Sequence, residues 1–160
     1  MKIAVCYPSF QLPKDVNDLE TLWDAMLSSQ SCITKNIPRY SIDDFAIKEK
    51  DKGFFETFGA IDSIASFDAD YFKFTALEAR STDPQHRLLL KHSAIALENA
   101  GYPTFNRDAL NCGVYMGICG SDYSDLLRYY HVPFTNNPYF AIGNTHATAT
   151  GRISRIFNLT

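Results

Sequence analysis

The sequence lacks a long apolar run and any run of Lys or Arg. No stretch approaches the roughly 20 apolar residues that span a bilayer, and the apolar run after Lys2 ends at Pro8, too early for the core of a signal peptide. The formal net charge is −3, without the basic patch that binds nucleic acid. We therefore expect a soluble, cytoplasmic chain that binds neither membrane nor nucleic acid.

Cysteine is also scarce, and the common site motifs are missing. The four cysteines are scattered without C-x-x-C spacing, and a cytosolic setting favours free thiols: Cys6, Cys32, Cys112 and Cys119. Cys112 and Cys119 are an odd number of positions apart, so a regular strand would point them to opposite faces. H-E-x-x-H, G-x-x-x-x-G-K and G-x-S-x-G are absent. We expect four reduced, mostly packed cysteines and no metal site.

The sequence contains one predicted helix, from Asp83 to Gly101, with a capping residue at each end. Asp83 can cap it, Pro84 suits its first position, and Gly101 can take the left-handed conformation that closes it. Apolar residues cover most of its circumference, so the helix is expected in the middle of a layered unit. Since 160 residues suffice for one core, we expect a single unit over residues 1–160.

The patterns around this helix predict strands and further helices. The apolar runs at residues 3–7 and 112–120 have strand length, and we expect the second to be the central strand of a sheet. Residues 15–29 predict a helix that Trp23 packs onto the sheet. The aromatic residues between 67 and 74 are expected to complete the packing of the central helix. A helix is also expected over 121–130, followed by a loop at 131–138.

Glycines frame the predicted strand at 112–120 and suggest a ligand site at its end. Repeated glycine indicates a close backbone approach or a tight turn, and strand ends of this kind border ligand crevices in open α/β sheets. Ile118, Cys119 and Gly120 are therefore candidates for the wall of a substrate pocket. A glycine requirement set by packing alone explains the pattern equally well.

Five segments, in order, resemble β-ketoacyl synthase domains, particularly those of polyketide synthases. Residues 83–90, DPQHRLLL, resemble the signature D-P-Q-x-R-x-L-L. The other matches are 67–72 with F-D-A-x-F-F, 113–117 with G-V-F-V-G, 121–123 with S-D-Y, and 152–154 with the end of N-R-I-S. The resemblance implies an α/β chain, the N-terminal half of a thiolase-like fold, with a mixed sheet packed against helices. It also implies that 118–120 lie near the acyl pocket and that residues 140–157 form a helix.

The catalytic residues of the resembling family have no counterpart in this sequence. That family uses a cysteine in a D-T-A-C-S-S-type motif, two histidines and a supporting lysine. The sequence ends at Thr160, a few residues before that motif is expected, and none of the histidines matches a catalytic position: His86, His92, His131 and His146. His146 is interpreted as a satisfied packing histidine rather than a base. Tyr7 stands where the family has a glycine.

The resemblance implies a part in condensing acyl thioesters in polyketide or fatty acid biosynthesis. The chain would supply scaffold and pocket wall, without a catalytic residue and without a cofactor of its own, and would be inactive alone. Its implied partners are the remaining half of the ketosynthase domain, a second copy, and an acyl carrier protein that brings substrates on phosphopantetheine. The alternative is a stand-alone, non-catalytic interaction or scaffold module derived from a ketosynthase.

Overall fold

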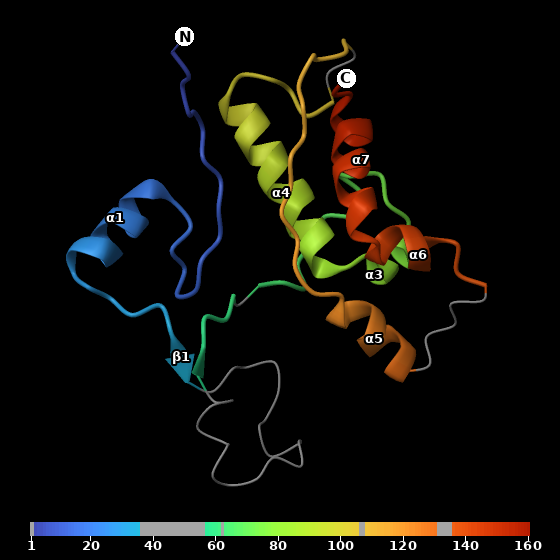
Figure 1. Ribbon diagram of the computed structural model, residues 1–160, viewed down its shortest axis with the longest axis horizontal. Coiled ribbons are helices and arrows are strands. Elements are labelled where there is room, and N and C mark those ends of the chain that lie inside the picture. The colour runs from blue at the N-terminus through green and yellow to red at the C-terminus, as the bar shows by residue number, and fades with distance from the viewer. Residues whose placement is uncertain (1, 36–56, 62, 106–107, 131–135) are drawn as a thin grey trace, which may run out of the picture. The chain divides into compact units, whose positions relative to one another are not determined.

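A computed structural model describes residues 2–35, 57–61, 63–105, 108–130 and 136–160 (Figure 1). The chain divides into two compact units, one of residues 1–8 and 65–160 and one of residues 9–64. The assignment of residues 1–160 to one partial domain stays a prediction. Within the described ranges, no helix is both long and apolar enough to cross a bilayer.

The unit of residues 9–64 contains α1 (Leu19–Leu27), β1 (Thr34–Lys35) and β2 (Thr57–Phe58), and the two strands pair antiparallel. Asp18 caps α1 by accepting a hydrogen bond from the Thr21 amide at 2.8 Å, which lowers the pKa of the Asp18 carboxyl. The prediction that Trp23 packs α1 onto a sheet is wrong, because its side chain is 61% exposed. In the described part of this unit the sheet has two residues per strand, too little surface to cover a helix.

The other unit is organised around α4 (Pro84–Asn99), and the predicted ends of this helix are confirmed. The Asp83 carboxylate accepts from the Gln85 amide at 2.8 Å, Pro84 occupies the first turn, and Gly101 has φ +84°. His86, Leu90 and Ala94 are the buried residues of the helix. Their spacing of four residues defines the face that meets the core.

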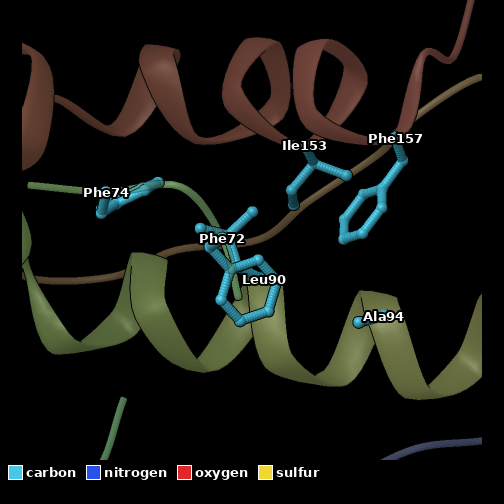
Figure 2. Close-up of a cluster of buried hydrophobic side chains, with 6 residues drawn as sticks. All are labelled: Phe72, Phe74, Leu90, Ala94, Ile153 and Phe157. Atoms are coloured by element: carbon cyan, nitrogen blue, oxygen red, sulfur yellow. The ribbon is translucent and has the colours of Figure 1, made fainter. Parts of the chain in front are cut away.

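The core of this unit lies between α4 and α7 (His146–Phe157), which pack side by side in Figure 1. Figure 2 shows the six buried side chains: Leu90 and Ala94 from α4, Ile153 and Phe157 from α7, and Phe72 and Phe74 from the segment before α3. The Phe67 ring stacks on Phe72 with centroids 5.1 Å apart. The predicted packing role of the aromatic cluster is confirmed, and each fully buried Leu or Phe side chain contributes about 1.5–3 kcal/mol.

Three shorter helices complete this unit: α3 (Ala76–Ser81), α5 (Asp122–Tyr129) and α6 (Tyr139–Asn144). The helix expected over 121–130 is α5. The segment expected as one helix over 140–157 is two, because Thr145 has the extended angles φ −91° and ψ 123° and breaks it into α6 and α7. Residues 131–135 of the predicted loop lie outside the described residues.

The prediction of two strands in this unit is wrong for the structure described here. Residues 3–7 and 112–120 lie in no strand, and Val5 and Tyr115 are 96% and 92% exposed. The nearest to a ladder is one parallel bridge, Leu110 with Leu159, extended by the Cys112 amide donating to the Thr160 carbonyl at 3.1 Å. A strand exists only by pairing with a neighbour, and the described residues offer none to these two segments. In the part of the chain that the structure describes, these two segments therefore do not join a mixed sheet.

The four cysteines follow the same pattern. All are free thiols, with Cys6 and Cys119 exposed and Cys32 and Cys112 partly buried. The expectation that they are mostly packed is wrong for Cys6 and Cys119. Both belong to the segments that were expected to be covered strands, so the missing strand pairing leaves them open to solvent.

Candidate functional site

The predicted pocket wall, residues 118–120, immediately precedes α5. Ile118 is partly buried, while Cys119 and Gly120 are exposed. Gly120 has φ +82°, in the left-handed region that favours glycine. A Cβ at this position would come no closer than 3.7 Å to a neighbouring atom, the Asp122 carboxylate oxygen. Backbone conformation, not lack of space, is therefore the reason for glycine here.

Two side chains from separate helices meet at the carbonyl oxygen of Gly120. His146, the first residue of α7, has its Nε2 atom 2.6 Å from this oxygen, and the Gln85 amide of α4 donates to it at 3.4 Å. A carbonyl oxygen only accepts hydrogen bonds, so Nε2 of His146 carries the proton. His146 is thus hydrogen-bonded as predicted, but it is exposed rather than packed.

The other end of this turn is held by Tyr123. Its hydroxyl donates to the Arg80 carbonyl at the end of α3 at 2.6 Å. The Arg87 guanidinium of α4 lies 6.0 Å from the centre of its ring. Gly120 and Tyr123 together fasten the turn between 118 and α5 to α3, α4 and α7.

His86 lies buried on α4, one position after Gln85. It is 2% exposed, and neither ring nitrogen has a hydrogen-bond partner in the described structure. Burial lowers the pKa of this imidazole, against the opposing effect of the Asp83 carboxylate, while the nearby Arg152 and His146 lower it further. His86 is therefore neutral at pH 7 and is closed off from any substrate.

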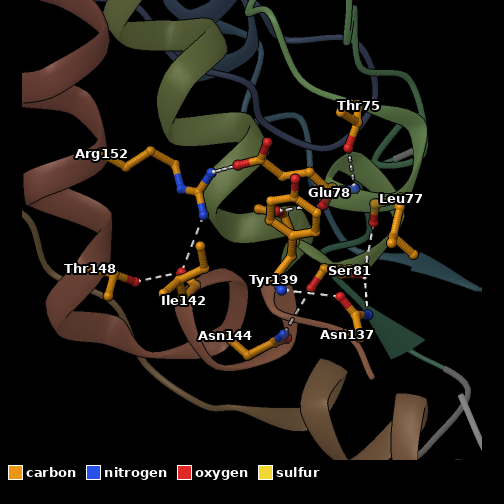
Figure 3. Close-up of polar contacts among 11 residues, drawn as sticks. Thr75, Leu77, Glu78, Ser81, Asn137, Tyr139, Ile142, Asn144, Thr148 and Arg152 are labelled. Atoms are coloured by element: carbon orange, nitrogen blue, oxygen red, sulfur yellow. Dashed lines mark hydrogen bonds and ion pairs between the residues drawn. The ribbon is translucent and has the colours of Figure 1, made fainter. Parts of the chain in front are cut away.

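A polar network joins α3, α6 and α7, as Figure 3 shows. Arg152 of α7 forms an ion pair with Glu78 of α3 at 2.8 Å and donates to the Ile142 carbonyl of α6 at 3.2 Å. Both charged side chains are at least four-fifths buried, being 10% and 17% exposed. Asn137 and Asn144 donate to the Ser81 hydroxyl and carbonyl at 2.7 and 2.8 Å. The network ties α7, the helix that begins at His146, to α3 and α6.

A cleft of about 750 Å³ opens beside α7, away from residues 118–120, which do not line it. Its walls are largely aromatic and aliphatic, from Phe72, Phe74, Phe105, Ile142 and Ile156. Lys73, Arg152 and Arg155 add positive charge, part of which Glu78 neutralises. The predicted pocket wall and this cleft are therefore separate features of the unit.

Comparison with known proteins gives the family of the chain. The family profile described as "Beta-ketoacyl synthase, N-terminal domain" matches residues 2–160. The chain belongs to the β-ketoacyl synthase family. The non-reducing polyketide synthase Preu3 of Preussia isomera is 34% identical to it over 148 residues, 90% of this chain and 6% of the relative. The polyketide synthase PksL of Bacillus subtilis is 32% identical over 162 residues, 98% of this chain and 3% of the relative. This ketosynthase chain thus spans a small part of the length of these relatives.

Solved structures agree with the family and give the fold class. The ketosynthase from module 6 of the bacillaene synthase of Bacillus subtilis superposes with a TM-score of 0.71 at 28% identity, covering 93% of this chain and 23% of that one. An oxazolomycin ketosynthase domain of Streptomyces albus, at 22% identity, shares the fold with a TM-score of 0.74 over 93% of this chain. The fold class is therefore confirmed as an α/β, N-terminal portion of a thiolase-like ketosynthase.

Sequence reasoning found the turn at 118–120 from its glycines but missed what holds it. Gln85 carried a signal, as the third residue of the matched D-P-Q segment, and that signal did not say which atom it contacts. His146 carried none, because no local pattern links a histidine at the start of one helix to a carbonyl 26 positions earlier.

Proposed function

We propose that this ketosynthase chain forms part of an enzyme that condenses acyl thioesters, in which it supplies scaffold and one wall of the acyl pocket. The family assignment supports the reaction class, and the fixed turn at 118–120 supports the wall. The single observation that carries the proposal is the match over residues 2–160, because it extends over almost the whole chain.

The chain's own residues would bind and orient rather than react. Condensation needs a cysteine thiolate that takes the acyl group, and groups that polarise the thioester carbonyl. Of the four thiols here, Cys119 lies nearest the start of a described helix, and Asp122 and Asp125 put negative charge in the first turn of that helix, α5. The nucleophile and its histidines would come from the remaining half of the domain.

The partners proposed for the assembled enzyme follow from this division. The segments at 2–8 and 112–118, which lie in no strand of the described structure, would pair with strands of the remaining half. A second copy would complete a dimer, and an acyl carrier protein would deliver the substrate on phosphopantetheine. No bound cofactor is proposed for the chain itself. Polyketide rather than fatty acid synthesis is favoured, since the relatives described above are polyketide synthases.

A chimera tests the proposal. This chain would replace the corresponding N-terminal portion of the bacillaene module 6 ketosynthase, and the product would be incubated with an acyl thioester. Mass spectrometry should show one acyl group on the nucleophilic cysteine outside this chain, followed by a carbon–carbon bond when an extender thioester is added. A folded chimera that takes no acyl group, while the parent ketosynthase does, would contradict the proposal. Binding of this chain to that remainder without restored acylation would favour the interaction module.

A further inference from the structure

We infer that His146, assisted by Gln85, is a positioning residue that fixes the conformation of the wall segment 118–120 by holding the Gly120 carbonyl. The hydrogen bonds stand on the structure alone. The consequence for the acyl pocket rests on the function proposed above.

The Gly120 carbonyl oxygen accepts two hydrogen bonds of unequal length. At 2.6 Å the His146 contact is a short hydrogen bond, whereas the Gln85 contact at 3.4 Å is at the long limit. His146 therefore contributes most of the restraint and Gln85 the smaller share. The left-handed conformation of Gly120 is compatible with a carbonyl that faces the first turns of both α4 and α7.

The two donors, Gln85 and His146, lie on helices that are bonded to their neighbours. The Asp83 carboxylate caps α4 at the Gln85 amide, and the Asp83 amide donates to the Gly143 carbonyl of α6 at 2.9 Å. Gly143 packs so closely that a Cβ there would lie 2.6 Å from the Ser81 carbonyl oxygen. The start of α4 is thus bonded to α6, which packs on α3, and the Arg152–Glu78 ion pair ties α7 to α3. A carbonyl bonded to both α4 and α7 is therefore held between helices that are joined to each other.

The role of His146 in this inference is to position the wall segment, not to transfer a proton. Because Nε2 of His146 donates its proton to Gly120, this nitrogen cannot accept a proton from a substrate. His146 would act instead through the residues next to Gly120. It would fix the direction in which the Cys119 side chain points and how far the Ile118 side chain extends into the acyl pocket. Loss of this hydrogen bond would let the wall move and would relax discrimination between acyl chains.

The test on this chain uses backbone ¹⁵N relaxation of residues 118–121. In His146→Phe, which keeps an aromatic ring and removes the donor, their order parameters should fall from about 0.85 toward 0.6 or below. The Gly120 carbonyl ¹³C shift should move at the same time. His146→Gln, which keeps an N–H donor, should recover most of both signals, and Gln85→Leu should give a smaller change than His146→Phe.

Arg155→Gln, on the same helix, is the matched control and should leave these signals unchanged. Unaltered amide shifts at Ile153 and Phe157 would show that α7 is intact in each variant. If His146→Phe leaves the order parameters and the carbonyl shift as they were, the inference is wrong. Equal loss in the Phe and Gln variants would also overturn it, since the donor would then not be what matters.

The chimera supplies the second readout. There His146→Phe should change the ratio of acylation rates for long against short acyl thioesters by about fivefold, the factor that corresponds to one ordinary hydrogen bond. A chimera that is inactive with either residue would refute the proposed function and leave the relaxation result standing. An active chimera with an unchanged ratio would refute the link between this hydrogen bond and discrimination among acyl chains.

Discussion

The layer formed by α3, α4, α6 and α7 and the two segments at 2–8 and 112–120 belong to the same compact unit but differ in completeness. The helices bury a shared core, and Leu90 at its centre has no exposed surface. The two segments instead expose large apolar side chains such as Val5 and Tyr115. Helices satisfy their backbone hydrogen bonds internally, while strands need a neighbour. Within the described residues, therefore, the helices have the partners that they pack against, whereas the two segments have no partner strand.

Removing the centre of the helical layer should have the largest effect. Leu90→Ala leaves a cavity between α4 and α7 and should lower the free energy of unfolding by about 2–5 kcal/mol, measured by urea denaturation followed by circular dichroism. Leu126→Ala in α5 is the control, because this leucine is 49% exposed and should cost less than about 1 kcal/mol. Equal losses in the two variants would show that the helical layer is not a packed core.

Two glycines offer a test with opposite signs. Gly143→Ala would place a Cβ 2.6 Å from the Ser81 carbonyl oxygen, so it should destabilise the unit by about 1–3 kcal/mol. A Cβ added at Gly151 of α7 would meet no atom within 4 Å outside the backbone of its own helix. Gly151→Ala should therefore stabilise by about 0.5–1 kcal/mol, since alanine favours the helix. Thermal unfolding of both variants would check this, and the same sign in both would count against the close approach of α3 and α6.

The buried His86 should make the helical layer sensitive to acid. Its pKa is lowered in the folded state, so as pH falls through the ordinary value of 6.5 the unfolded chain takes up a proton that the folded chain does not. Stability should be full above about pH 7 and fall between pH 7 and pH 5, by at most about 1.4 kcal/mol per pH unit for one proton. His92, whose pKa burial also lowers, adds a contribution of the same sign.

The measurement is the urea midpoint against pH for the parent chain and for His86→Phe. The variant should keep only the shallower slope that His92 leaves. An unchanged slope would mean that His86 is not held neutral in the folded chain.

Changes in the exposed segments should have the smallest effect on stability. Val5→Thr and Tyr115→Thr remove apolar side chains that touch little, so the free energy of unfolding should stay within about 0.5 kcal/mol of the parent. Self-association should weaken, because exposed apolar surface promotes it. Sedimentation at rising concentration would show this. A loss of stability comparable to that of Leu90→Ala would mean that these segments already pack in the isolated chain.

The same contrast explains how much of the molecule the sequence could predict. Asp83, Pro84 and Gly101 act within a few residues of themselves, so the bounds of α4 were predicted closely. The apolar runs at 3–7 and 112–120 have the length and composition of strands, but they can form strands only where a partner strand pairs with them. Trp23 was assigned to a sheet that the described residues do not contain. Local patterns thus predicted helices and failed where structure depends on distant pairing.

In the candidate site too, the local feature could be predicted from the sequence and the distant contact could not. The glycines around Cys119 indicated a special turn, and Gly120 has the left-handed conformation that such a turn uses. The contact from His146 could not be predicted, because it depends on the break at Thr145 that starts α7 beside the turn. Thr145 itself is neither proline nor glycine, and Gly143 lies inside α6.

Hydrogen exchange on the chain, alone and with the remainder of the bacillaene module 6 ketosynthase, tests the central claim most directly. Alone, amides of α4 and α7 should be protected, while those of residues 3–7 and 113–118 should exchange at the rate of an unpaired chain. With the remainder added, the two segments should become protected and the helices should change little. Protection of the segments in the isolated chain, or no gain on adding the remainder, would contradict the account.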